Sequence, residues 1–383
     1  MGIAPQPFTY NVSDEALADL RSRLSATRLP DQAPGKAWAY GTEVNYLRDL
    51  IDYWRTAFDW HAQEAALNAF PQFKVPLHDI NVHFLHVAGK GPNPLPLLLL
   101  HGWPGSVFEF LDIIPRLTDP ARFGGDPADA FTIVAPSLPG YGLSFQPGQK
   151  RFAIPDIAAC VADLMTEVLG YQRYAAQGGD WGAAVSSCLG RSHAGPLVGI
   201  HLNMLALRRD VPAPSQPSPD EQRFLDEMGV WTRERSGYGM IQGTRPQTLS
   251  FGLSDSPAGL AAWIAEKFYA WSDCDGIIES AIDRDRMLGN ISLYWFTGAI
   301  GSSFWPYYGV RHSAFFLDGG TIDVPMGYVA FPKEIARPPR SIAEQTYANI
   351  QRWTEMPRGG HFAALEQPEA LACDVQAFFR PLR

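Results

Sequence analysis

The sequence predicts an α/β fold in which a mostly parallel central sheet carries helices on both faces. Between residues 73 and 207, short apolar runs typical of strands alternate with segments of helical periodicity. Strands and helices that alternate in this way form parallel sheets, because each helix returns the chain to the end at which the next strand begins. The alternation stops after residue 207 and resumes at about residue 313. The length of 383 residues suits one large domain with insertions or two unequal domains.

The first 72 residues predict a helical region ahead of the sheet. Ser13 is a typical cap for a helix in which leucines recur at helical spacing, at Leu17, Leu20 and Leu24. Thr42 is the expected cap of a second helix, whose apolar side consists of Val44, Leu47, Leu50, Ile51, Trp54 and Phe58. From Phe73 onward, polar and apolar residues alternate as in a strand.

The core elements follow in order along the chain. After the buried strand "PLLLLHG", Ser106 and Glu109 predict a capping box for a helix through "FEFLDIIPRL". Helices are also expected at 154–170, from Gly182 and at 368–382. The remaining strands are expected within 131–142, 173–177, 197–205, 321–331 and 348–356.

A predicted lid interrupts the sheet. Residues 208–312 begin with a proline-rich stretch and are otherwise mainly helical, and Ser218, Pro219 and Glu221 form a clear helix start. An insertion at this place covers the carboxyl ends of the strands, where parallel sheets bind ligands. We therefore expect an N-terminal helical region (1–72) packing on the lid, a core (73–207 and 313–383) and a lid (208–312).

The charge balance excludes several classes of partner. The formal net charge is −9 and the isoelectric point is about 5.5, so phosphate backbones and anionic lipid surfaces repel the protein. We expect neither nucleic acid nor a membrane as partner. The sequence does not decide between a monomer and a homodimer.

The cysteines and the start of the chain indicate a cytoplasmic protein. Four cysteines lie far apart, which is typical of reduced thiols and suggests no metal site. His78, His83 and His86 are close in sequence, but residues an odd number apart on a strand face opposite sides. The start lacks the pattern of a signal peptide, and the longest aliphatic run is far shorter than the ~20 residues that span a bilayer.

An aspartate occupies an unusual turn at "GGDWG", residues 178–182. Small residues around a central nucleophile are typical of a strained strand-to-helix turn that exposes one side chain, usually a serine. A carboxylate such as Asp180 attacks an electrophilic sp³ carbon to give an ester, which water then cleaves. The turn therefore favours epoxides or alkyl halides over esters and peptides as substrates. The alternative is that Asp180 only caps the following helix.

Four motifs give the chain a recognisable resemblance. "HGWPGS" (101–106), "PSLPGYGLS" (136–144), "QGGDWG" (177–182) and "GGHFAALEQPE" (359–369) resemble those of the α/β-hydrolase-fold epoxide hydrolases, especially the microsomal type. The N-terminal region is similar to the one that wraps against the lid in that group. The membrane-anchoring segment of the animal microsomal enzymes is absent from this sequence.

The resemblance implies roles for individual residues. Asp180 corresponds to the nucleophile and His361 to the base that activates water, while the backbone N–H groups of Trp103 and Trp181 correspond to an oxyanion hole. Among the acids available to orient His361, which are Asp318, Asp323 and Glu334, the resemblance favours Glu334. Two lid tyrosines that hold the epoxide oxygen match Tyr238 in "ERSGYGMIQ" and Tyr307 in "SSFWPYYGVR", although the sequence also allows Tyr308.

The sequence therefore predicts a cofactor-independent epoxide hydrolase that acts on a small apolar or aromatic epoxide. A haloalkane or haloacid dehalogenase is an alternative, because it uses the same fold and the same aspartate. The two lid tyrosines and the N-terminal region favour epoxides. A non-catalytic binding protein of the same fold is a further alternative, against which the set Asp180, Glu334 and His361 argues.

Overall fold

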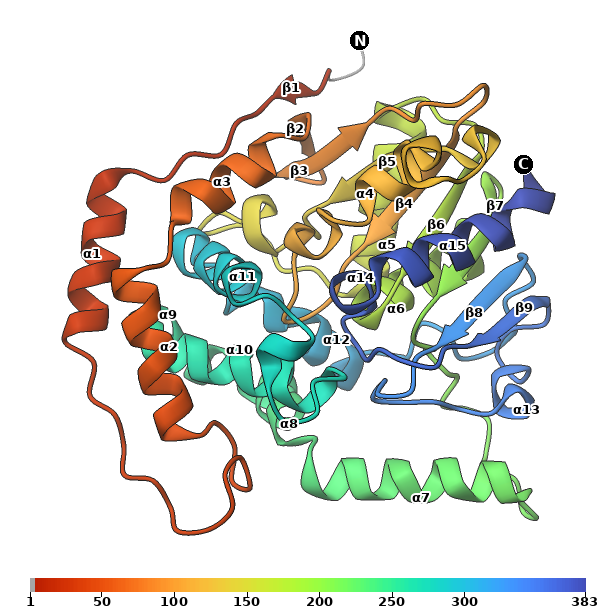
Figure 1. The fold of residues 1–383 in the computed structure, drawn as a ribbon. Coiled ribbons are helices and arrows are strands. Elements are labelled where there is room, and N and C mark those ends of the chain that lie inside the picture. Colours follow the sequence, from red (N-terminus) through yellow and green to blue (C-terminus); the bar gives the residue numbers. More distant parts are fainter. Residues whose placement is uncertain (1–3) are drawn as a thin grey trace.

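The core of the molecule is a nine-stranded sheet, seen in a computed structural model that describes residues 4–383 (Figure 1). The order across the sheet is β1-β2-β3-β5-β4-β6-β7-β8-β9. The strands are β1 (Gln6–Pro7), β2 (Gln72–Leu77), β3 (Ile80–Val87), β4 (Leu95–Leu100), β5 (Phe131–Pro136), β6 (Tyr174–Gly178), β7 (Leu197–Leu202), β8 (Met326–Ala330) and β9 (Ile350–Glu355).

The sheet is mostly parallel, as predicted. The pairs β1/β2, β2/β3 and β3/β5 are antiparallel, and every pair from β5 through β4 to β9 is parallel. Strand order reverses around β4, which lies between β5 and β6 although it precedes both in the chain. The crevice at such a reversal, outside the carboxyl ends of the strands, is where open α/β sheets bind ligands.

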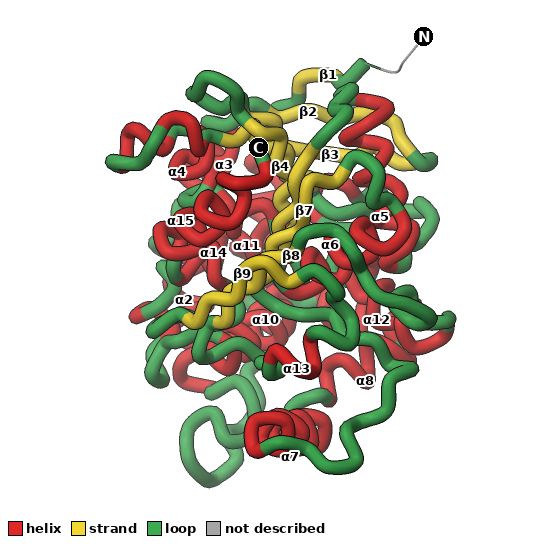
Figure 2. Tube along the Cα trace, turned by 90° about the vertical axis from the view of Figure 1, so that its right-hand side faces the viewer, coloured by secondary structure: helices red, strands yellow, loops and turns green. Residues whose placement is uncertain are grey.

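Two apolar layers cover the two faces of the sheet. Leu98 and Leu100 of β4 belong to one cluster, and Leu97 and Leu99 belong to the other, because successive side chains of a strand point to opposite faces. Helices α5 (Ile154–Asp163) and α6 (Asp180–Ser192) complete the first layer, while α4 (Ile114–Thr118) and α15 (Pro368–Phe379) complete the second. Figure 2 shows these two helix pairs on opposite sides of the sheet. Two short helices, α13 (Arg340–Ala343) and α14 (Ala363–Glu366), lie in the last third of the chain.

The helices of the N-terminal region lie beside the helices of the inserted segment (Figure 1). The former are α1 (Asp14–Ser25), α2 (Val44–Thr56) and α3 (Trp60–Asn68), and the latter are α7 (Pro219–Glu234), α8 (Gly237–Thr244), α9 (Pro246–Asp255), α10 (Pro257–Trp271), α11 (Arg284–Thr297) and α12 (Trp305–His312). The Thr42 hydroxyl donates to the Ala262 carbonyl over 2.7 Å, and Arg23 pairs with Asp255 at 3.0 Å. The bounds predicted for the three regions stay a prediction, and residues 1–3 lie outside the described residues.

Helix caps agree with the sequence at two sites and differ at two others. Ser13 caps α1, and Ser218 with Glu221 forms the capping box of α7. The prediction for Thr42 was wrong, because the Glu43 carboxylate caps α2 instead. The helix predicted behind Ser106 is interrupted: a 3₁₀ helix (Val107–Phe110) precedes α4, and the Ser106 hydroxyl accepts from the Phe108 amide.

None of the helices formed by residues 4–383 is both long enough and apolar enough to cross a membrane.

Candidate active site

Asp180 lies at the sharp turn between β6 and α6, at the carboxyl end of the sheet. Its φ of +48° is in the left-handed region, which few residues other than glycine adopt. The turn closes because its neighbours lack side chains: a methyl group on Gly182 would overlap the carbonyl oxygen of Leu100, and one on Gly178 would overlap the backbone of Gly182. The glycines of "GGDWG" therefore allow the close approach that directs Asp180 out of the turn.

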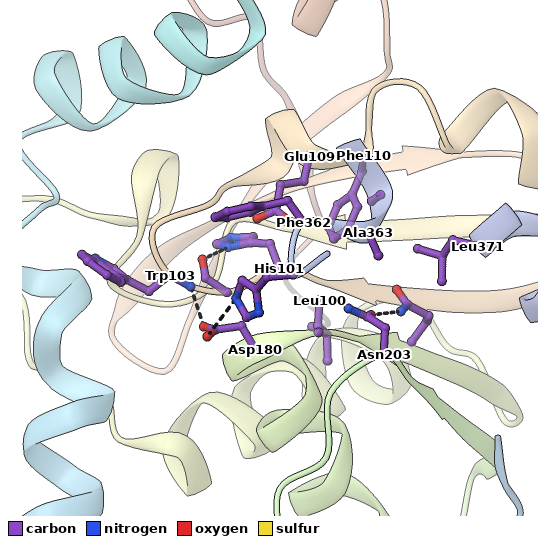
Figure 3. Close-up of a pocket in the computed structure, with 15 residues that line it drawn as sticks. Leu100, His101, Trp103, Glu109, Phe110, Asp180, Asn203, Phe362, Ala363 and Leu371 are labelled. Carbon is purple, nitrogen blue, oxygen red and sulfur yellow. Dashed lines mark hydrogen bonds and ion pairs between the residues drawn. The ribbon is translucent and has the colours of Figure 1, made fainter. Parts of the chain in front are cut away.

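The Asp180 carboxylate points away from the helix that follows it. Its Oδ1 accepts a hydrogen bond from the Trp103 amide over 2.7 Å, and its Oδ2 lies 3.4 Å from His361 Nε2 (Figure 3). Gly179 is the N-cap of α6, and no side chain caps that helix. The alternative that Asp180 serves as a helix cap is therefore contradicted.

His361 and Glu334 form a buried pair behind Asp180. His361 Nδ1 lies 2.7 Å from Glu334 Oε1, and both residues are 5% exposed. The same carboxylate oxygen accepts from the Ile335 amide over 2.6 Å, which fixes its position. Glu334 lies in the loop after β8, four residues beyond the end of the strand, and His361 lies in the loop between β9 and α14. The fold thus places His361 between two carboxylates, with Glu334 at its Nδ1 and Asp180 at its Nε2.

The charges around His361 control its protonation. Burial disfavours the charged imidazolium, but the carboxylates of Glu334 and Asp180 and their hydrogen bonds outweigh this effect and raise its pKa well above the ordinary value. The two carboxylates therefore favour the imidazolium form of His361. A change that neutralises Asp180 removes part of this stabilisation and favours release of the proton.

The other acids considered from the sequence lie elsewhere. Asp318 accepts hydrogen bonds from the Arg209 and Asp210 amides, and Asp323 is exposed. The expectation that Asp323 lies within a strand was wrong, because β8 begins only at Met326. Both residues are separated from His361 by the length of that strand.

Two backbone amides are available to bind an oxyanion beside Asp180. The Trp103 amide already donates to Asp180 Oδ1. Trp181 is the second residue of α6, and the first N–H groups of a helix have no acceptor within it. That these two amides form an oxyanion hole stays a prediction.

Tyr238 of α8 and Tyr307 of α12 lie together over this end of the sheet. Tyr238 stacks on the Trp103 indole with 5.4 Å between ring centroids, and Tyr307 contacts Trp181 edge-on at 4.6 Å. The two tyrosine rings are 5.8 Å apart. Burial raises the pKa of both hydroxyls above the ordinary value, so both keep their protons and can donate them.

Tyr308 is directed elsewhere. Its ring stacks on His312 at 3.9 Å and on Trp305 at 4.9 Å, both within α12. Of the two tyrosines that the sequence allowed, the geometry therefore favours Tyr307, which lies beside Trp181.

Comparison with known proteins agrees with this geometry. The family model for the epoxide hydrolase N terminus matches residues 5–110, and that for the alpha/beta hydrolase fold matches residues 96–235. The chain is 46% identical, over 98% of its length and 85% of the relative's, to a Stigmatella aurantiaca protein provisionally named an epoxide hydrolase. It is 37% identical to rabbit epoxide hydrolase 1, over 97% of this chain and 88% of that protein. The chain belongs to the epoxide hydrolase family.

Solved structures of this family have the same fold. Juvenile hormone epoxide hydrolase from the silkworm Bombyx mori superposes with a TM-score of 0.91 at 33% identity, over 100% of this chain and 95% of the silkworm chain. Epoxide hydrolase from Aspergillus niger has a TM-score of 0.87, also at 33% identity, over 100% of this chain and 97% of its own. The α/β-hydrolase fold predicted from the sequence is confirmed.

Two neighbours of the epoxide hydrolase site were not singled out by the sequence. The Trp271 ring lies 5.1 Å from the His361 ring and 5.2 Å from that of Tyr238. It therefore forms part of the wall of the site on the lid side. His101 is buried and neutral, since burial lowers its pKa to about 4, and its Nε2 accepts from the Leu138 amide over 3.1 Å. His101 thereby holds the strand end that carries Trp103. The "HGWPG" motif contained the signal for His101, but nothing in the sequence distinguished Trp271 from other lid aromatics.

The histidines near the start of the sheet do not form a group. His78 pairs with Asp163, His83 contacts Ser137 and Gln72, and His86 contacts Tyr171. Each imidazole has its own local partner.

Two cavities adjoin the site. A small one of about 20 Å³ lies against Asp180 and His361 and is also lined by Glu109 (Figure 3). A larger one of about 950 Å³, the outer cleft, is lined by Tyr238 and Trp271, by residues 38–41 of the N-terminal region and by lid residues of α10. Tyr238 and Trp271 thus face both the site and the outer cleft.

Proposed function

We propose that this protein hydrolyses an epoxide to a vicinal diol through a covalent ester on Asp180. One observation carries the proposal: the turn directs the Asp180 carboxylate toward the Trp103 amide, which binds it, and toward His361, 3.4 Å away. This arrangement suits a nucleophile followed by a base that acts on the ester it forms.

In the first step, a carboxylate oxygen of Asp180 attacks one epoxide carbon while Tyr238 and Tyr307 donate to the ring oxygen. The carbon–oxygen bond of the epoxide breaks as the ester bond forms, and one tyrosine transfers its proton to the departing oxygen. Protonation of this leaving group lowers the barrier, and general acids of this kind typically contribute ~10²–10⁴-fold. The protein is left with an ester at Asp180 and a tyrosinate.

Esterification then converts His361 from an acid into a base. Asp180 no longer carries a negative charge, so the pKa of His361 falls and its proton passes to the tyrosinate. His361 is neutral, and Glu334 holds its Nδ1–H so that Nε2 faces the ester.

In the second step, His361 takes a proton from water, and the hydroxide adds to the ester carbonyl. The Trp103 and Trp181 amides stabilise the resulting oxyanion, and one such donor is typically worth about 3 kcal/mol. The ester bond breaks, and the second proton of the water leaves with the diol. Asp180 is again a carboxylate and His361 is again protonated, as at the start.

We further propose that the substrate carries a large apolar or aromatic substituent. Of the two cavities that adjoin the site, the outer cleft has the volume for such a group, about 950 Å³ against about 20 Å³, and it is lined by Tyr238 and Trp271. The outer cleft begins at these two rings, and Trp38 and Tyr269, stacked at 4.0 Å, line it. Aromatic walls of this kind favour a planar or long apolar group.

Two variants test the covalent route. With His361→Gln, the ester forms but is not cleaved, so one equivalent of substrate should remain attached to the peptide that contains Asp180 in mass spectrometry. With Asp180→Asn, no adduct and no diol should form although the protein stays folded, as judged by circular dichroism. Diol formation by folded Asp180→Asn would contradict the proposal.

A further inference from the structure

Glu109 is a half-buried carboxylic acid that the proposed mechanism does not use. It lies in the 3₁₀ helix after the "HGWPG" loop, and its side chain lines the small cavity together with Asp180 and His361 (Figure 3). The residue keeps part of its surface accessible, and the Ser106 backbone N–H lies within reach of its carboxyl. Glu109 therefore presents polar atoms to a cavity beside the reacting groups.

Local structure turns this side chain inward. A methyl group on Gly105 would overlap the Glu109 carboxylate, so the carboxylate rests directly on the glycine backbone. On the other side, the Ser106 hydroxyl donates to Asn290 of α11 over 2.7 Å, and the Asn290 amide donates to the Pro104 carbonyl over 2.8 Å. These bonds tie the loop to the lid and leave Glu109 directed at the cavity.

The cavity has the size and the polarity to hold one water molecule. A buried water needs about 10–15 Å³ of accessible volume and two to four polar partners, and this cavity offers about 20 Å³. The carboxyl of Glu109, the Nε2 of His361 and the carboxyl of Asp180 supply three partners from different elements. A carboxyl group offers several acceptor sites, so Asp180, beside the Trp103 amide, and Glu109, beside the Ser106 amide, can each still accept a hydrogen bond from a water.

We propose that this cavity binds the water that cleaves the Asp180 ester, and that Glu109 is the residue that positions it. This inference rests on the proposed function, because only an ester at Asp180 requires such a water. The water donates one hydrogen to His361 Nε2 and the other to a Glu109 oxygen, which directs its lone pair at the ester carbonyl. His361 then removes the first proton as described above, and Glu109 neither gains nor loses a proton. Glu109 is thus a positioning residue for the second step alone.

The protonation of Glu109 suits this role. Burial raises its pKa to about 8, and the nearby charges of His361 and Asp180 act on it in opposite directions. At neutral pH the carboxyl is mostly uncharged, so it accepts a hydrogen bond from water through its carbonyl oxygen without competing with water for the His361 proton.

Glu109→Met and Glu109→Gln separate positioning from packing. Methionine has a similar unbranched shape but no oxygen, whereas glutamine keeps a carbonyl oxygen at the same place. Single turnovers of a styrene-type epoxide would be followed by tryptophan fluorescence for alkylation, since Trp103 and Trp181 flank Asp180, and by quenched-flow detection of diol for hydrolysis. We expect Glu109→Met to alkylate within 2-fold of the wild-type rate and to hydrolyse the ester at least 10-fold more slowly.

The steady state should change in the same sense. Because kcat/KM reports alkylation and kcat reports hydrolysis, Glu109→Met should lower kcat and KM together and leave kcat/KM unchanged. The ester should accumulate during turnover, visible as an added mass on the intact protein. Glu109→Gln should restore most of the hydrolysis rate. Asp112→Asn, on the same segment but with a 57% exposed side chain, is the matched control and should leave both steps unchanged.

Three outcomes overturn the inference. They are wild-type hydrolysis in Glu109→Met, equal loss of both steps, and a Glu109→Gln variant as slow as the methionine variant. Failure of the proposed function has a different signature, because then neither the wild type nor His361→Gln forms an adduct.

Discussion

At the scale of single residues, the site depends on one aspartate held in a conformation that aspartates rarely adopt. A residue other than glycine with positive φ typically costs 1–3 kcal/mol, and the surroundings of Asp180 must supply that energy. The Trp103 amide bound to its Oδ1 and the close contact of the turn with β4 are the interactions that do so.

The Gly182→Ala variant tests how the turn is held. The added methyl group would overlap the Leu100 carbonyl oxygen, so the strand and the helix must separate. We expect a loss of about 2 kcal/mol or more in the free energy of unfolding, measured with urea, together with a loss of activity. Gly252→Ala is the matched control, because Gly252 is also helical and has open space around it, and it should be neutral or slightly stabilising. Equal stability of the two variants would refute this account of the turn.

The raised pKa of Glu109 predicts how the stability of the protein depends on pH. Its pKa rises from an ordinary 4.5 to about 8 on folding, so the folded protein binds a proton that the unfolded chain has lost between these values. The contribution of this group to stability is therefore complete below about pH 4.5 and disappears as pH rises through 8, at a slope of up to about 1.4 kcal/mol per pH unit. Glu109→Gln cannot titrate, so its stability relative to wild type should rise from pH 5 to pH 8 in urea unfolding. Parallel stability curves would contradict the raised pKa.

The positions of the site residues were predictable where a motif contained them, and less so where the fold determined them. The sequence predicted Asp180, His361 and Glu334 as site residues, and the structure brings these three together. The capping box predicted for Glu109 is formed in part, because the Ser106 backbone N–H acts on its carboxyl, but spacing does not reveal the contact of this side chain with Gly105 or its place at the cavity.

At the scale of elements, the two lid helices α8 and α12 bring one tyrosine each to the same place. The sequence "WPYY" cannot say which of two adjacent tyrosines faces the core, since neighbouring residues on a helix point about 100° apart. The contacts decide it: Tyr307 meets Trp181, and Tyr308 stacks on His312.

Phenylalanine substitutions at these two positions give opposite expectations. Tyr307→Phe removes a donor to the epoxide oxygen, so the alkylation rate should fall by about 10²-fold in single-turnover experiments. Tyr308→Phe should leave it unchanged, because that hydroxyl is directed elsewhere. A slow Tyr308→Phe with a normal Tyr307→Phe would reverse the assignment.

Helix positions were easier to predict from the sequence than helix ends. The apolar side of α2 was correctly expected, but its cap moved from Thr42 to Glu43, because the Thr42 hydroxyl is used to hold the Ala262 carbonyl of the lid. A local pattern favoured one role for Thr42, and a contact 220 residues away selected another.

At the scale of the whole molecule, the N-terminal region and the lid together form one wall of the outer cleft. Trp38, with a φ of +64°, stacks on Tyr269 with an interplanar angle of 5°. The alternation of strands and helices predicted the sheet, but this wall joins segments more than 200 residues apart, and no local pattern predicts such a contact.

Trp38→Ala tests whether the outer cleft holds the substrate. For an epoxide with a long aryl substituent, we expect KM to rise by about 2- to 10-fold, since a lost aromatic contact is worth ~0.5–1.5 kcal/mol. For a short alkyl epoxide, which does not reach the cleft, kcat/KM should stay as in the wild type. Equal effects on both substrates would mean that Trp38 acts through the fold rather than through substrate binding.

The central claim is that Asp180, and not water, attacks the epoxide, and oxygen labelling tests it most directly. In a single turnover with excess enzyme in ¹⁸O-labelled water, the diol should carry no label, because its new oxygen comes from the Asp180 carboxylate. Repeated turnovers should then place ¹⁸O in the peptide that contains Asp180. Label in the diol of the first turnover would mean that water attacks the epoxide directly, and would contradict the account.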